Sequence, residues 1–372
     1  MEKSYHRLQQ RSVHKSPLLL EVLVHRDHSH PKALPEAMLA KLKCDRLNLA
    51  PEVRKIRLRE GAVRGSLFLP SGNRSTKHDK FLGRNSQTPL PPRKRQQNAH
   101  RGSCASVLGI SMGEGRFLGV IDMFGEDGGL VEYRSSLLAS RGFASLALPY
   151  FAFENLPPAK SEFHLEYFED VADFLIRHPK VRGSGVGVTA SGKGSDLALL
   201  MITFLPQVIA AVSVSGCCAN TAAPLSYKDF TIPALAYDMS RVQNSETSVF
   251  DISEALDDPL DSANSQCLIP VEKAQGSFMF VVGDDLNWKS SVYAMATMSC
   301  LQQSGKSNYN LLSCPGAGHQ IDPPSSPFCP VAVNRVLGVP ILGGGELKAH
   351  CQAQEDSCQK IQDFFLDALK IR

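Results

Sequence analysis

The sequence lacks any apolar run of the roughly 18 residues that a helix needs to cross a bilayer, which excludes a membrane-spanning helix. Its basic amino terminus has neither the apolar core nor the cleavage site of a signal peptide. Its last residues, Lys-Ile-Arg, are not the Ser-Lys-Leu address of peroxisomes. We therefore expect a cytoplasmic protein, with the peroxisome and the mitochondrion as open alternatives.

Cysteine is present without a pattern. The chain has ten cysteines, and no two of them form Cys-x-x-Cys. In a chain of 372 residues this spacing argues against a disulfide framework or a zinc site, so we expect reduced thiols and no bound metal. Cys217 and Cys218 follow a predicted strand as neighbours, and we interpret them as core residues.

Basic charge is concentrated in one segment. Residues 71–102 carry eight Lys or Arg and a single acid, Asp79, whereas the whole chain has a net charge of +3. The stretch PPRKRQQ within it is compatible with a nuclear address or a nucleic-acid patch. Low hydrophobicity with high charge is more typical of a solvated linker, so nucleic acid is not the partner we favour.

Two β-type segments precede this linker. PLLLEVLVH and IRLREGAVRGSLFLP, within residues 17–70, show apolar runs with partial alternation. Residues 71–116 are poor in apolar side chains and rich in Ser, Asn, Pro, Arg and Gly, which predicts a loop or a disordered insertion.

From residue 117 onward, apolar strands alternate with helices. The pattern predicts strands at 119–124, 143–148, 186–188, 208–216, 277–283 and 308–314, and helices over 130–142, 164–179, 197–204, 288–305 and 354–370. Strands without a polar face, alternating with helices, indicate a parallel sheet covered on both sides. In such folds the chemistry lies at the carboxyl ends of the strands.

Three strand ends carry the residues of a hydrolase. TASGKGSD (189–196) is a glycine turn between a strand and a helix, VVGDDLNW places Asp284 and Asp285 after a strand, and His319 follows the strand LLSC. Turn, acid and His come in the chain order of the α/β-hydrolases. There the His accepts the proton of the nucleophile, and the carboxylate orients the His.

At these motifs the chain resembles the family of acyl-CoA thioesterases and bile acid-CoA:amino acid N-acyltransferases. The similarity spans about residues 117–368 and rests on GVIDMFG, GGLVEYRSSLLASRGFASLAL, LEYFEDVADFLIRHPKVRGSGVGV, IPVEKAQG, VGDDLNWKS, PGAGHQIDPP and GGELKAH. The family usually has Gly-Gln-Asp-Asp where this chain has Gly-Asp-Asp. Matching by motif puts the acid on Asp285 and the base on His319, with Asp284 as the alternative acid.

The resemblance implies an α/β-hydrolase fold, a mostly parallel sheet with helices on both faces, behind an N-terminal β-sandwich. It divides the chain into a truncated sandwich over 1–70, the basic insertion over 71–116 and the catalytic domain over 117–372. It also implies thioester hydrolysis of fatty or bile acyl-CoA, or acyl transfer to glycine or taurine, without a separate cofactor because coenzyme A is part of the substrate.

The nucleophile is where the chain departs from the family. Matching on Gly185, Gly187, Lys193 and Gly194 puts Gly192 at the position of the family's Ser or Cys. Ala190 and Gly194 supply the small residues that such a turn needs, so only the reactive side chain is absent. Ser191 is the fallback nucleophile, but it requires a shift by one residue that places Lys193 where a small residue packs.

Two readings of the centre follow. One is an active enzyme with an elbow nucleophile, Asp285 and His319, whose oxyanion hole uses the backbone N–H groups of Lys193 and of Gly125 or a neighbour. The other is a catalytically impaired protein that binds acyl-CoA without turning it over. The pattern GISMG around Ser111 also matches Gly-x-Ser-x-Gly, but no helix follows it, and residues 73–112 look inserted into a short loop.

Overall fold

The computed structural model describes residues 53–70, 116–125, 128–159, 161–244, 248–334 and 338–370. It also describes the backbone of three short antiparallel strands, β1 (Tyr5–Leu8), β2 (Glu21–His25) and β3 (Lys41–Lys43). The predictions for residues 73–112 and for Ser111 lie outside the described residues. In the described part of the chain, no helix is long and apolar enough to cross a membrane.

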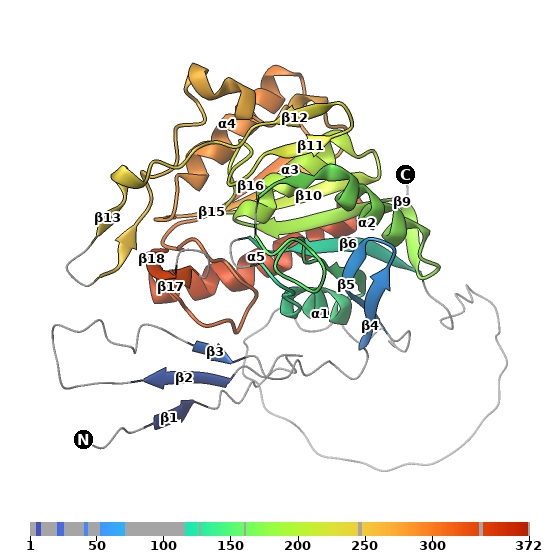
Figure 1. Cartoon of the computed structure of the whole chain (residues 1–372). Coiled ribbons are helices and arrows are strands. Elements are labelled where there is room, and N and C mark those ends of the chain that lie inside the picture. Colours follow the sequence, from blue (N-terminus) through green and yellow to red (C-terminus); the bar gives the residue numbers. More distant parts are fainter. Residues whose placement is uncertain are drawn as a thin grey trace, which may run out of the picture.

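An eight-stranded sheet forms the centre of the molecule (Figure 1). Its order is β16 (Tyr309–Cys314), β15 (Ser277–Gly283), β10 (Val208–Val214), β9 (Val181–Ser191), β6 (Phe117–Met123), β7 (Phe143–Ala147), β5 (Val63–Pro70) and β4 (Val53–Glu60). The strands from β16 to β7 are parallel, and β5 and β4 are antiparallel additions. The predicted parallel sheet is therefore confirmed.

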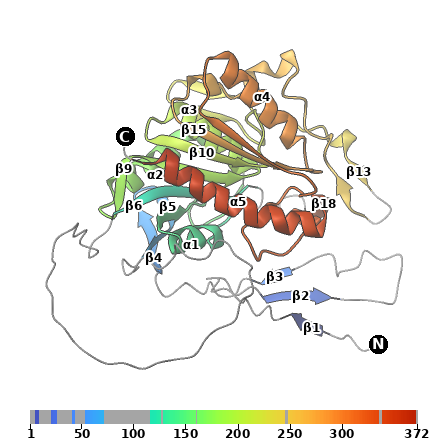
Figure 2. The same cartoon turned by 180° about the vertical axis from the view of Figure 1, so that it is seen from behind.

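Helices cover both faces of the sheet. α1 (Tyr133–Ser140) and α5 (Leu347–Ala368) lie on one face, where Figure 2 shows α5 running across the strands. α2 (Leu165–Arg177), α3 (Lys193–Phe204) and α4 (Ser290–Gln303) lie on the other. Two apolar clusters thus sandwich the strands, and this is the α/β-hydrolase arrangement that the sequence predicts.

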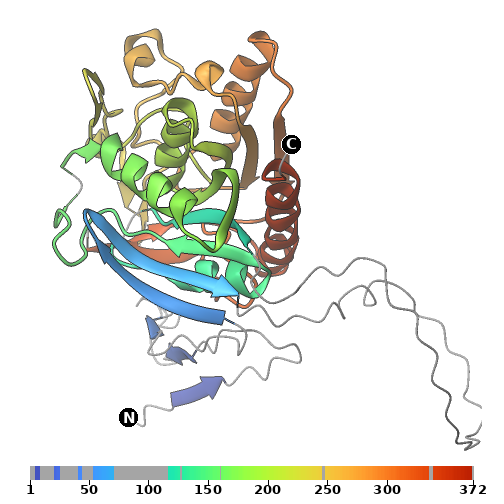
Figure 3. The same ribbon diagram turned by 90° about the vertical axis from the view of Figure 1, so that its right-hand side faces the viewer.

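The boundary expected at residue 70 is wrong for the last strands before it. β4 and β5 form a hairpin at the edge of the main sheet, not part of a separate sandwich (Figure 3). Ser66, Leu67 and Phe68 pair with β7, and the side chains of Leu67 and Phe68 are fully buried. Alternating hydrophobicity predicts a strand but not the sheet that it joins, which explains the error.

Smaller elements surround the carboxyl ends of the strands, and none of them was predicted. They are the sheet of β8 (Phe163–His164), β11 (Leu225–Tyr227) and β12 (Phe230–Ile232), the sheet of β13 (Gln243–Asn244), β14 (Phe250–Asp251), β17 (Val331–Asn334) and β18 (Val339–Leu342), and short 3₁₀ helices at Met239–Arg241, Ser262–Cys267 and Val271–Lys273. α5 also begins at Leu347, earlier than the predicted residue 354.

Candidate active site

The turn between β9 and α3 has the geometry of a nucleophile elbow. Gly192 has φ +54° and ψ −128°, its N–H donates to Val214 O over 3.1 Å, and its own oxygen accepts from Ser195 N over 2.9 Å. A non-glycine side chain rarely adopts this left-handed region. The chain therefore turns sharply at Gly192, directly at the carboxyl end of β9.

Small residues flank this turn, as the sequence predicts. A Cβ atom at Gly194 would lie 3.1 Å from Phe124 O and 3.3 Å from the Cβ of Ala190, which is itself fully buried. Both contacts are tighter than most Cβ contacts, so a larger side chain at position 194 would push the turn away from β6. Gly192 lies two residues from both Ala190 and Gly194, so the packing supports the register that puts Gly192 at the tip of the turn.

Ser191 is the last residue of β9 and lies beside Arg134. Its Oγ accepts a hydrogen bond from Arg134 Nη1 over 2.8 Å. The same guanidinium pairs with the buried carboxylate of Asp122 and donates to Met123 O over 2.6 Å. Ser191 thus belongs to a polar network between β6, β9 and α1.

The side chain of Lys193 is buried in the body of the domain. Its Nζ donates to Asn220 Oδ1 over 2.8 Å and lies 3.4 Å from Asp196 Oδ2. Asp196 also accepts from the hydroxyl of Thr221 over 2.6 Å. Burial raises the pKa of Asp196 to about 6, although Lys193 opposes the shift. Because the side chain is directed inward, Lys193 presents its backbone to the turn, where it begins α3.

Gly125 lies against the elbow from the end of β6. A Cβ atom there would meet Ser191 O at 2.7 Å and Lys193 N at 2.9 Å, so only glycine fits without a shift. The hydroxyl of Tyr150 lies 2.6 Å from Phe124 O and 2.9 Å from Gly125 O and holds this segment in place. The two backbone segments expected to form the oxyanion hole therefore meet. Helix amino termini favour negative charge at such a point.

Asp285 and His319 form a buried pair. Asp285 Oδ2 lies 2.9 Å from His319 Nδ1, and the two side chains are 1% and 9% exposed. The other oxygen of Asp285 accepts from the backbone N–H groups of Asn287, over 2.8 Å, and Trp288, over 3.3 Å. The carboxylate is thus fixed by its own loop and faces the imidazole.

Asp284 faces elsewhere. Its Oδ2 accepts from Gly316 N over 2.7 Å and joins the loop after β15 to the loop after β16. Of the two acids left open by the sequence, Asp285 is the one that contacts His319.

Trp288 links this pair to the elbow. Its ring packs edge-on against His319 with 5.6 Å between the ring centres, and its Nε1 donates to Ser215 O over 2.8 Å. The residue before Ser215, Val214, accepts the N–H of Gly192. The three strand ends singled out in the sequence therefore come together around residues 214 and 215.

A second acid near the His was not predicted. Asp322 is half-buried and hydrogen-bonded to the hydroxyl of Tyr133, and desolvation raises the pKa of both groups. Its carboxylate also interacts electrostatically with Arg134 and His319. The motif HQIDPP contained the acid, but its distance from Tyr133 in the sequence hid the contact.

The cysteines and potential metal ligands offer no competing centre in the part of the chain that the structure describes. Cys217 and Cys218 are buried free thiols, and burial raises the pKa of Cys217. No group of three His, Cys, Asp or Glu side chains among the described residues is arranged to hold a metal ion.

Comparison with known proteins shows the family of this chain. The family described as BAAT / Acyl-CoA thioester hydrolase C terminal matches residues 163–371. Human acyl-coenzyme A thioesterase 6 is 44% identical over 76% of this chain and 68% of its own length. The mitochondrial human acyl-coenzyme A thioesterase 2 is 37% identical over 98% and 66%, and mouse acyl-coenzyme A amino acid N-acyltransferase 2 is 38% identical over 98% and 77%. This chain belongs to the family of acyl-CoA thioester hydrolases and acyl-CoA:amino acid N-acyltransferases.

Proposed function

We propose that this chain binds acyl-CoA with the thioester at the elbow, in an acyl-transfer centre whose nucleophile position is occupied by Gly192. The observation that carries the proposal is the backbone of Gly192, φ +54° and ψ −128°, between β9 and α3. The buried Asp285–His319 pair ends two other strands at the same edge of the sheet. The substrate class comes from the name of a relative, human acyl-coenzyme A thioesterase 6.

Each remaining group has a defined role in this proposal. Asp285 accepts a hydrogen bond from Nδ1–H of His319, which leaves Nε2 as the base and stabilises the imidazolium cation. In this proposal the backbone N–H groups of Lys193 and Gly125 donate to the oxyanion that forms when the thioester carbonyl is attacked. No side chain at Gly192 can make the acyl-enzyme, so the covalent step that splits the reaction in two is lost.

The alternative nucleophile, Ser191, has less support. It is a strand residue, its Oγ is held by Arg134, and Arg134 is held in turn by Asp122. For Ser191 to attack, this hydrogen bond must break and the turn must shift by one residue. That shift would bring the buried Lys193 to the position where Gly194 now packs against Ala190.

The catalytically impaired form is therefore the version of the family function that we favour. An active hydrolase, or a transferase to an amino acid acceptor such as glycine or taurine, is the second candidate, because a thioesterase and an amino acid N-acyltransferase are both among the relatives. Titration with palmitoyl-CoA together with a hydrolysis assay separates them. Binding with negligible release of CoA supports the impaired form, and rapid release contradicts it.

The compartment is a separate proposal. The cytoplasmic location expected from the sequence stays a prediction. Because a mitochondrial thioesterase is 37% identical, the mitochondrion is the alternative compartment to test. Fractionation of cells that express the tagged full chain tests it.

A further inference from the structure

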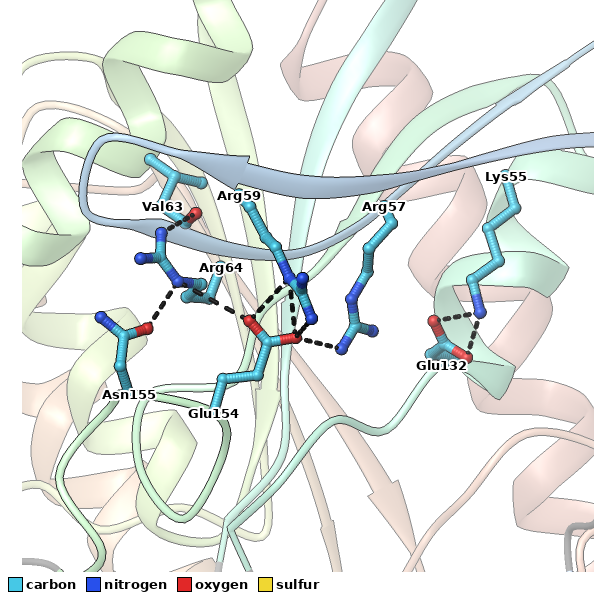
Figure 4. Close-up of polar contacts among 8 residues, drawn as sticks. All are labelled: Lys55, Arg57, Arg59, Val63, Arg64, Glu132, Glu154 and Asn155. Atoms are coloured by element: carbon cyan, nitrogen blue, oxygen red, sulfur yellow. Dashed lines mark hydrogen bonds and ion pairs between the residues drawn. The ribbon is translucent and has the colours of Figure 1, made fainter.

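A basic patch lies on the β4–β5 hairpin. We define it as Lys55, Arg57, Arg59 and Arg64. Lys55, Arg57 and Arg59 alternate along β4, so they share one face, and Arg64 pairs with Arg59 across the hairpin. Figure 4 shows these side chains extending from the hairpin toward the loops that carry Glu132 and Glu154.

The patch carries more positive than negative charge. Three guanidinium groups share the single carboxylate of Glu154, at 2.8 Å from Arg57, 3.0 Å from Arg59 and 3.7 Å from Arg64. Lys55 pairs with Glu132 at 2.6 Å. Four cations thus face two carboxylates, and hydrogen bonds from Arg59 and Arg57 lower the pKa of Glu154, which keeps it ionised.

Donors in the patch remain available. The side chains of Arg59 and Arg57 are 69% and 39% exposed. Within the described residues, Arg57 uses only Nη2 for hydrogen bonding, and Arg59 leaves Nη1 without a partner. A guanidinium has five N–H donors in a planar fork that matches a phosphate group.

The patch is connected to the elbow through one loop. Glu154 and Tyr150 both lie in the loop after β7, and the hydroxyl of Tyr150 contacts Gly125 O, next to the elbow. In the sheet, β4 is four strands from β9, which at about 4.8 Å per strand gives a separation of roughly 19 Å. CoA carries its diphosphate and 3′-phosphate at the far end of its long pantetheine arm.

We propose that this basic patch binds the phosphate groups of CoA when the thioester lies at the elbow. The inference rests on the proposed function. Three arginines on one carboxylate carry more positive charge than is needed to hold the hairpin against the loop. Several phosphate charges on one ligand offset the surplus.

The experiment compares ligands with and without phosphates. Isothermal titration calorimetry gives the Kd of decanoyl-CoA and of S-decanoyl-pantetheine, which keeps the thioester and the pantetheine arm but has no phosphate. Arg59→Ala is the test variant, because Glu154 keeps Arg57 and Arg64. Arg54→Ala is the matched control, since Arg54 is exposed on the opposite face of the same strand.

We expect wild type to bind decanoyl-CoA more tightly than decanoyl-pantetheine. Arg59→Ala should weaken decanoyl-CoA about fivefold and leave decanoyl-pantetheine unchanged, whereas Arg54→Ala should change neither. Glu154→Gln, which removes a negative charge, should tighten decanoyl-CoA. Inorganic pyrophosphate added as a competitor should weaken decanoyl-CoA alone and only at concentrations far above the Kd of decanoyl-CoA.

Two results overturn the inference in different ways. If decanoyl-pantetheine binds as tightly as decanoyl-CoA, or if Arg59→Ala and Arg54→Ala have equal effects, acyl-CoA binding stands and the patch is only a structural clamp. If neither thioester binds, the proposed function fails, and the inference about the basic patch fails with it. Circular dichroism on each variant verifies that the hairpin change has not unfolded the chain.

Discussion

Replacing Gly192 by serine is expected to create a thioesterase. The change puts a hydroxyl at the tip of the elbow, where the Asp285–His319 pair and the convergent backbones of Lys193 and Gly125 are already assembled. In a serine hydrolase, loss of the nucleophile lowers kcat by about 10⁶-fold, and oxyanion and binding groups keep a residual 10³ to 10⁴ over water. Restoring it should raise the rate by roughly 10³-fold or more.

The substitution has a modest cost in stability. A Cβ atom at φ +54° costs on the order of 1 kcal/mol. A domain is stable by about 5–15 kcal/mol, so the variant should stay folded with a thermal midpoint lower by roughly 2–4 °C. Gly192→Cys should be tolerated equally, because it places a Cβ atom at the same backbone position.

The assay follows release of the CoA thiol from palmitoyl-CoA with a thiol reagent. Adding His319→Ala to the Gly192→Ser variant should remove the gain, because the hydroxyl then has no base. Ser191→Ala in the wild-type background should change nothing. The reasoning is refuted if wild type is already fully active and Ser191→Ala abolishes that activity, since Ser191 is then the nucleophile.

Three other outcomes are expected. The pKa of Asp196 is about 6 instead of 3.8, so the native state binds this proton more tightly than the unfolded state, and the stabilisation falls as pH rises from about 4 to 6. Urea titrations over this range should show a smaller fall of the unfolding free energy in Asp196→Asn than in wild type. An equal dependence on pH in the two proteins would argue against the shift. Residues 66–68 should exchange their amide hydrogens as slowly as residues 208–214, because they pair with β7; fast exchange would mean that the hairpin detaches from the main sheet. Deleting residues 73–112, whose composition is typical of a linker, should change the thermal midpoint by only a few degrees, and a much larger drop would show that they pack.

The sequence alone predicted the alternating strands and helices of residues 117–370. Those patterns are local: each strand from β6 to β16 in the main sheet is a short apolar run, and each long helix has its own periodicity. It also predicted three strand ends of interest, because in a parallel sheet the carboxyl ends meet at one edge. The positions of Asp285 and His319 in motifs after strands needed no knowledge of contacts.

Only the tertiary structure decided the contacts of these residues. Asp284 and Asp285 are chemically identical neighbours, and what separates them is that one carboxylate faces Gly316 N and the other the imidazole of His319. The sheet that the hairpin of residues 53–70 joins depends on its pairing with β7, which alternation within the hairpin cannot reveal.

Buried polar groups were the hardest to foresee. The first turns of α5, residues 347–353, were not predicted; His350 within them is 2% exposed and packs against Phe328. Arg134, Asp122 and Ser191 likewise lie far apart in the sequence and meet only in the fold. A charged side chain is predicted to be exposed because its burial without a partner is costly, and the partner that offsets this cost is supplied by the tertiary structure.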